Sequence, residues 1–338
     1  MTLVFLARSR LPIYGVASEE CKLAADRYAT SVAAITQALD QLEGAFLVKR
    51  EESGQQCWGF VHPTFADAVS SILSGRPDLV ELYLRGAKIE TLLAEAVCEG
   101  ARNVKDAVVV PVSSFDTLVS RLLETPDESN LNELLFLFLN RRAPRDVVQS
   151  VLEQAPELLN RDGDPSPWIG IGRHAKVILH AMAYSMNLLE EDTRFTTCQS
   201  LEDAALFSLD VSFLSDEGVL AMLRPHESMR LAIKLVAMLE EKIPSKIEET
   251  EDEADPDRDI DDQFESVSSF VTEMYSIGDE DEKVNERLDI LQEIIKSAKT
   301  RVEERKSTDD QPSFFNSVPS AAIAKEATLR SIFSDIDE

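Results

Sequence analysis

A short strand pattern interrupts an otherwise helical sequence in the first third of the chain. Residues 35–44 carry apolar side chains at helical spacing and end at a glycine, which predicts an amphipathic helix. Residues 45–50 and 57–61 are rich in strand formers and flank a glycine-bearing turn, so they predict a β-hairpin. After a proline, residues 64–73 return to helical spacing. This region is therefore a small mixed domain in a mainly α protein.

The order helix, hairpin, helix is the layout of a winged helix-turn-helix domain, which we predict for residues 1–93. Two upstream helices, at 1–10 and 18–28, complete the expected domain. Winged helices commonly bind DNA, but the helix in the recognition position, residues 31–43, has no Arg or Lys and carries two acidic residues. The one basic pair in the hairpin is followed directly by two glutamates. This charge pattern argues against DNA binding.

Residues 94–245 predict an all-α helical array, which we interpret as a sensor or scaffold domain. Apolar side chains recur at helical spacing, and loops with Pro, Asp or Gly separate the helices. No fixed repeat period links them, so the sequence does not establish a solenoid. The expected helices cover residues 131–139, 144–152, 174–189, 214–223 and 230–239.

Acidic residues crowd the C-terminal part of the chain. The 338 residues have a net charge of −28, and residues 245–338 hold 27 acidic and 11 basic side chains. Like charges at this density repel each other and bury nothing, so we predict an acidic linker at 246–262 in a partly disordered C-terminal region. C-terminal helices and a tail are expected over 263–338, with helices at 264–275, 282–304 and 321–333.

Charge and composition argue against several functions. Phosphate contacts need Lys and Arg, so a net charge of −28 argues against nucleic acid and against anionic membranes as partners. The sequence has no apolar run of about 18 residues and no basic segment that starts a signal peptide, so we expect a cytoplasmic protein. The four cysteines have no metal-binding spacing and predict small core or surface thiols: Cys21, Cys57, Cys98 and Cys198.

One region resembles a known bacterial family. The turn Trp58-Gly-Phe-Val-His-Pro-Thr64, with the segments 77–86 and 89–93, is similar to the part of the novel STAND NTPases that follows the ATPase core. STAND proteins are signal-transducing ATPases with numerous domains. The resemblance is strongest over residues 35–93 and weaker over 94–245. It implies a winged helix that docks on an ATPase core, a helical sensor, and bacterial signalling such as defence against phage.

The resemblance also singles out His62 as a cofactor-binding residue. In related plant resistance and apoptotic ATPases, a histidine at the matching place contacts the β-phosphate of bound ADP and holds the resting state. By this resemblance, His62 reads ADP held by a partner domain. Pro63 stands where those relatives carry Asp, which is a departure from their pattern. The alternative is structural, with His62 packed at the strand end and Pro63 opening the next helix.

The chain lacks the phosphate-binding loop of such ATPases. A Walker A loop needs G-x-x-x-x-G-K-[ST], and no Gly-Lys pair occurs in this sequence. No G-x-S-x-G motif occurs either. We therefore expect no catalytic residue, no metal site and no cofactor in this chain, with ATP or ADP bound only together with a partner NTPase domain. The leading hypothesis is a non-catalytic regulatory portion of a STAND-type signalling NTPase, acting through protein–protein interaction.

Two other functions stay open. One is a winged-helix transcription regulator, whose DNA binding would weaken with salt. The other is a free-standing helical interaction protein. The expected partners are an NTPase domain and a trigger protein, and the oligomeric state is open. From the missing Walker A loop we expect a fragment, a split-gene product or a protein that lost its ATPase domain. Met1 would lie inside the expected first helix, which leads us to expect a truncated start.

Overall fold

The described part of the chain is mainly helical, with 69% helix and 7% strand. A computed structural model describes residues 29–52, 54–74, 76–101, 107–275 and 282–309, together with residues 4, 11–13, 22, 25 and 26. The chain divides into two compact units, Met1–Ala232 and Ile233–Glu338. The mainly α fold class is thus confirmed. The domain boundaries expected at residues 93 and 245 stay predictions.

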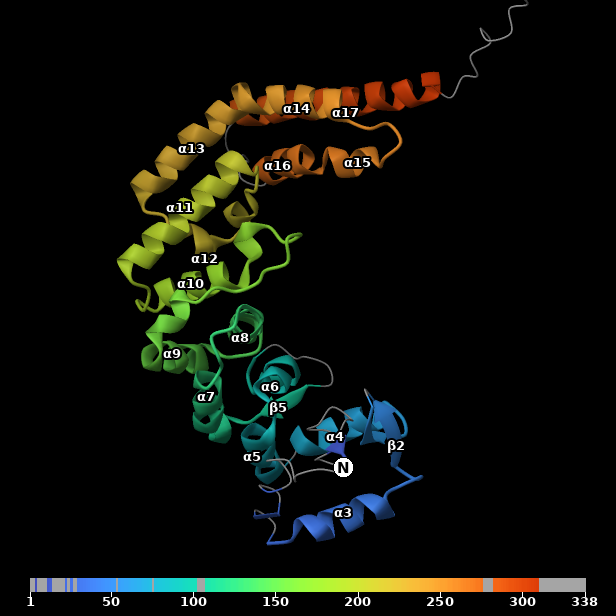
Figure 1. Cartoon of the computed structure of the whole chain (residues 1–338). Helices are drawn as coiled ribbons and strands as arrows, with labels where there is room; N and C mark the ends of the chain where they lie inside the picture. The colour runs from blue at the N-terminus through green and yellow to red at the C-terminus, as the bar shows by residue number, and fades with distance from the viewer. Residues whose placement is uncertain are drawn as a thin grey trace, which may run out of the picture. The chain divides into compact units, whose positions relative to one another are not determined.

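The first unit begins with a mixed segment and continues as helices (Figure 1). Its elements are β1 (Leu11–Pro12), α3 (Val32–Gln41), β2 (Leu47–Glu52), β3 (Gln55–Phe60), α4 (Thr64–Ser74), α5 (Pro77–Gly86), α6 (Ile89–Glu95), β4 (Ala96–Cys98), β5 (Val108–Val110), η1 (Val112–Ser114), α7 (Phe115–Leu123), α8 (Ser129–Arg141), α9 (Arg145–Gln154), η2 (Pro156–Asn160), η3 (Ile171–Arg173), α10 (Ala175–Ser185), α11 (Glu191–Phe207), η4 (Ser212–Ser215) and α12 (Glu217–Leu220). Helix α13 (Pro225–Glu240) contains the boundary between the units.

The predicted hairpin is confirmed and belongs to a three-stranded antiparallel sheet. Strand β3 lies in the middle, with β2 on one side and the short β1 on the other. Gly54 at the hairpin turn has a φ of +78°, a conformation that glycine adopts without strain. Helix α3 precedes the hairpin, and the Ser31 hydroxyl caps it by accepting the Ala34 N–H. Apart from residues 4, 22, 25 and 26, the helices expected at 1–10 and 18–28 lie outside the described residues.

A second, parallel pair of strands lies in the region that the sequence predicted to be all helical. Ala96 pairs with Val108, and Cys98 pairs with Val110. Strand β4 is wholly buried, and β5 nearly so, which is typical of parallel strands. The prediction of an all-α array from residue 94 is therefore wrong at its start. Strands of three residues are too short to show a period, although β5 is a run of β-branched residues.

The helices of the first unit stack in two rows (Figure 1). In one row α5 contacts α7, and α7 contacts α9; in the other, α6 contacts α8, α8 contacts α10, and α10 contacts α12. Each helix thus packs on the next but one along the chain. This is the stacking pattern of helical arrays such as α-solenoids, in which neighbouring repeats bury each other's apolar faces. One continuous apolar core runs from Val4 to Ala183.

The second unit contains α14 (Lys242–Glu253), α15 (Ile260–Gln263), α16 (Glu265–Tyr275) and α17 (Glu282–Asp309). Helices α14, α16 and α17 contact one another. The expected helices at 264–275 and 282–304 are confirmed, whereas 321–333 lies outside the described residues.

The prediction of an acidic linker over 246–262 is wrong in its first half, because α14 extends through residue 253. Ile243 and Ile247, one helical turn apart, are fully buried. Glu251 pairs with Arg301 at 2.6 Å and Arg305 at 3.4 Å, both on α17, and this pairing lowers the pKa of the Glu251 carboxyl. Two buried side chains and two arginines from a distant segment thus offset the repulsion that the local sequence predicted.

Candidate functional site

His62 lies in the turn between β3 and α4 and is exposed to solvent. Its Nδ1 accepts the backbone N–H of Thr64 at 3.3 Å and lies 2.9 Å from the Thr64 hydroxyl. The ring therefore caps the start of α4, as the structural alternative predicted. Since Nδ1 accepts, the neutral ring carries its proton on Nε2, for which the described part of the chain offers no partner. Capping the helix and donating to a bound anion are thus compatible roles.

Apolar side chains surround this turn. Val61, directly before His62, and Phe46 are both partly exposed. The Phe46 ring meets the Phe65 ring edge to face, with their centroids 5.3 Å apart. The Val61 N–H donates to the Phe46 carbonyl and ties the turn to the start of the hairpin. His62 therefore directly follows a partly exposed apolar residue that is tied to Phe46.

The hairpin's lysine is neutralised within the domain. The Lys49 ammonium lies 3.2 Å from Asp40 and 2.9 Å from Glu43, the two acidic residues of the expected recognition helix. These hydrogen bonds raise the pKa of Lys49. The same ammonium lies 4.5 Å from the centre of the Trp58 ring. A phosphate backbone would have to displace both carboxylates to reach this charge.

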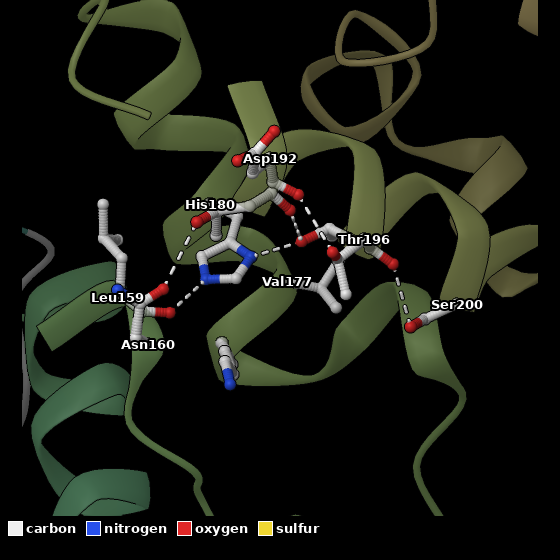
Figure 2. Close-up of a pocket in the computed structure, with 10 residues that line it drawn as sticks. Leu159, Asn160, Val177, His180, Asp192, Thr196 and Ser200 are labelled. Atoms are coloured by element: carbon white, nitrogen blue, oxygen red, sulfur yellow. Dashed lines mark hydrogen bonds between the residues drawn. The ribbon is translucent and has the colours of Figure 1, made fainter. Parts of the chain in front are cut away.

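The helical array contains a cavity of about 400 Å³ between α10, α11 and η2 (Figure 2). Most of its lining surface is apolar, although one face of α11 contributes four hydroxyl-bearing residues. The lining residues are Leu159, Asn160, Lys176, Val177, His180, Asp192, Thr193, Thr196, Thr197 and Ser200. No sequence motif marks this cavity, because its residues come from three separate elements.

His180 joins the three walls of this cavity and is 3% exposed. Its Nε2 donates to the Leu159 carbonyl at 2.8 Å (Figure 2). Its Nδ1 lies 2.7 Å from the Thr197 hydroxyl. That hydroxyl also lies 2.8 Å from the Thr193 carbonyl. When the His180 ring is neutral, its Nδ1 accepts a hydrogen bond from the Thr197 hydroxyl. When the ring is protonated, Nδ1–H donates to the Thr197 oxygen, and the Thr197 hydroxyl then donates to the Thr193 carbonyl. Burial lowers the pKa of His180, so the neutral arrangement prevails near pH 7.

A hydroxyl beside an imidazole is also the arrangement of a nucleophile and its base. Here the Thr197 hydroxyl is buried among its helix and His180. The outer hydroxyls of the cavity donate to carbonyls one turn back on the same helix, Thr196 to Asp192 and Ser200 to Thr196. These two bonds lie within α11, whereas the bonds of His180 to Leu159 and Thr197 join η2, α10 and α11. The polar groups that line the cavity are therefore these hydroxyls and the side chains of Asn160, Lys176 and Asp192.

The cysteines and the Gly-rich segment have structural surroundings. Cys57, Cys98 and Cys198 are buried thiols, and burial raises the pKa of Cys98 to about 12, which makes it a poor nucleophile at neutral pH. Cys21 lies outside the described residues. Residues 170–176 contain a 3-10 turn and the start of α10. Within the described ranges, no three His, Cys, Asp or Glu residues gather closely enough to hold a metal ion.

Comparison of the chain with protein-family models, curated proteins and solved structures finds no match. Among the residues that the structure describes, no helix is both long and apolar enough to cross a bilayer.

Proposed function

We propose that this chain is a non-catalytic regulatory module that binds other proteins, and the two rows of stacked helices support this most directly. Stacked helical arrays leave a long continuous face that suits protein partners. The array here runs from α5 to α12 within one unit. The residues with catalytic potential, His180 and Thr197, are buried and bonded to the array itself.

We further propose that the N-terminal segment is a winged helix that docks on a STAND-type NTPase domain. The sheet order β1-β3-β2, with α3 before the hairpin, supports the winged-helix assignment. The apolar surface around Phe46 and Val61 supports docking on protein. His62, at its edge, would donate from Nε2 to a phosphate oxygen of ADP held by that domain. Binding of a trigger to the array would shift the population toward a released NTPase.

A winged-helix transcription regulator is the second candidate, favoured by the same sheet order. The contacts of Lys49 argue against DNA binding. Its ammonium is already paired with Asp40 on α3 and with Glu43 just after α3, so this charge is not free for a DNA phosphate. A free-standing helical interaction protein is the third candidate, and it needs no nucleotide.

The proposal expects a P-loop domain to be encoded next to this chain, and a neighbouring gene without one would refute the split-gene form of it. The test is equilibrium binding of labelled ADP to the chain, alone and mixed with that domain. The proposal predicts a stable complex that retains ADP. His62→Ala should speed ADP release from this complex, while His226→Ala, a change of another exposed histidine, should not. A P-loop domain that does not bind the chain, or equal ADP release from both variants, would refute the NTPase part of the proposal.

A further inference from the structure

Helix α17 carries a second apolar edge besides the one that packs in the second unit. Its buried side chains, such as Leu291 and Ile295, belong to the face that contacts α14 and α16. Ile290 and Ile294 lie one turn apart, roughly 100° around the helix from that face. Ile290 is 44% exposed, and Ile294 is half-buried. A surface helix ordinarily carries one apolar stripe, so the second edge points to a further contact.

An open groove of about 540 Å³ follows this edge. Among the residues that the structure describes, α17 alone lines it, with Asp289, Ile290, Glu293, Ile294, Ser297 and Arg301. Positions 290, 294, 297 and 301 are spaced by four, three and four residues. This is the spacing of the positions that face a partner helix in coiled-coil packing. The groove therefore has the pattern of a site for one helix.

The charges at the two ends of the groove are engaged within the second unit. Asp289 accepts a hydrogen bond from the Tyr275 hydroxyl of α16. Arg301 pairs with Glu251 of α14 at 2.6 Å. Apolar contact with the two isoleucines, rather than ionic attraction, would therefore hold an occupant in the groove.

The segment of the chain that follows α17 has the matching pattern. Helix α17 ends at Asp309, and the sequence continues to residue 338. If the helix expected from the sequence over 321–333 forms, positions 322, 326, 329 and 333 share one edge, again at spacings of four, three and four residues. Leu329 and Phe333 give this edge two large apolar side chains.

Residues 310–320 are long enough to return the chain to the groove. To lie antiparallel on α17, the chain must come back from Asp309 to the level of Arg301, which is about 12 Å along the helix. A segment of about 11 residues reaches up to about 36 Å. Pro312 and Pro319 suit such a connection, because neither continues a helix. Attachment to α17 also holds the segment at about millimolar effective concentration beside the groove.

We propose that residues 321–333 dock as an antiparallel helix in the groove of α17, with Leu329 on Ile294 and Phe333 on Ile290. Groove and segment belong to the same compact unit. The proposal does not depend on the proposed function. Its consequence is that a protein that recognises either the groove or the Leu329–Phe333 edge must first displace one from the other.

Hydrogen exchange of the full chain tests this docking, with mass spectrometry of the fragments that cover 321–333. A docked helix protects its amides, so they should exchange at least about tenfold more slowly in the wild type than in Ile290→Asp. The matched control is Ile233→Asp, which changes an isoleucine of α13 that is 64% exposed and should leave this exchange unchanged. Phe333→Asp attacks the contact from its other side and should act like Ile290→Asp. Unchanged exchange within α14 and α16 verifies that Ile290→Asp stays folded.

Equal exchange of 321–333 in the wild type and in Ile290→Asp would overturn the proposal. Loss of protection in Ile233→Asp alone would overturn it as well, since it would place the segment on α13. A dilution series with light scattering distinguishes the chain's own segment from that of a second copy. Docking within one chain predicts a monomer whose protection does not change on dilution, whereas a dimer that loses protection on dilution would refute it.

Discussion

The buried ion pair of Arg194 and Glu227 offers the sharpest test of how the helical array is held. Arg194 on α11 is 2% exposed, and Glu227 in the first turn of α13 is 5% exposed. The guanidinium binds the carboxylate in a fork, with distances of 2.8 and 3.0 Å. Its Nη1 also donates to the Met222 carbonyl at 2.7 Å, and Glu227 accepts the Arg224 N–H at 2.8 Å. The pair therefore fixes the start of α13 on α11.

Removing one partner of a buried pair leaves an uncompensated charge, which costs about 3–5 kcal/mol of folding free energy. Glu227→Gln should lie at the lower end, about 3 kcal/mol, since Arg194 keeps its hydrogen bonds to Glu191. With a urea m-value of about 3 kcal/mol/M, the unfolding midpoint should fall by about 1 M. Circular dichroism during urea titration measures this shift. The matched control is Arg230→Met, which breaks the more exposed pair with Glu202 and should cost less than about 1 kcal/mol.

The pair also predicts a pH dependence. The hydrogen bond from Arg194 lowers the pKa of Glu227 from 4.5 to about 2. A carboxyl with a lowered folded pKa stabilises the fold fully above its unfolded pKa and loses this contribution as the pH falls toward its folded value. Wild-type stability should therefore fall between pH 4.5 and 2, and Glu227→Gln should fall less over the same range. A midpoint shift no larger than that of Arg230→Met, with the same pH profile as the wild type, would refute this reasoning.

Three further predictions test the fold. Ile247→Ala should destabilise the second unit by about 2–4 kcal/mol in urea, because Ile247 is buried in α14; a solvated linker would show no change. Gly172→Ala should cost about 1–3 kcal/mol by its clash with Phe213, whereas Gly218→Ala, whose nearest neighbour is 3.2 Å away, should be neutral or stabilising in the same titration. Because the pKa of His180 is lowered in the folded chain, the unfolded chain takes up a proton at a higher pH than the folded one. The free energy of unfolding should therefore decrease as the pH falls below 6.5. Thermal melting should show this decrease in the wild type and a smaller one in His180→Gln.

Local patterns were enough to predict the hairpin and most helices. The turn at Gly54 and the strand formers on both sides of it act within a few residues, so no distant contact is needed to specify them. The long helix α17 was predicted for the same reason. Its buried positions recur at helical spacing, as the sequence pattern indicated: Leu288, Leu291, Ile295 and Ala298.

Features that depend on distant segments could not be predicted in this way. Helix α14 is acidic, and the arginines that offset its charge lie about 50 residues later on α17. The β4–β5 pair consists of two three-residue strands that stabilise each other only when the chain brings them together. The two rows of helices have no sequence period, because each helix packs through its own set of side chains.

The candidate sites also differ in whether local sequence or distant contacts determine them. His62 was singled out by a local turn, and its cap on α4 is also local. Trp168, in the loop between η2 and η3, is 90% exposed and gave no comparable signal, because a tryptophan in a sequence usually indicates core. The segment that follows it is held by the hydrogen bond from the Gly172 N–H to the Ser212 hydroxyl, whose positions are 40 residues apart. Only the prolines next to Trp168 indicated a turn there.

His180 connects the cavity to the loop that carries Trp168. The loop leaves η2 just after Leu159, whose carbonyl accepts from His180, and it re-enters the array at α10, which carries His180 itself. The same ring contacts Thr197 on α11. One imidazole therefore joins η2, α10 and α11. A ligand in the cavity, or a proton on His180, would act directly on the contacts that hold these three elements together.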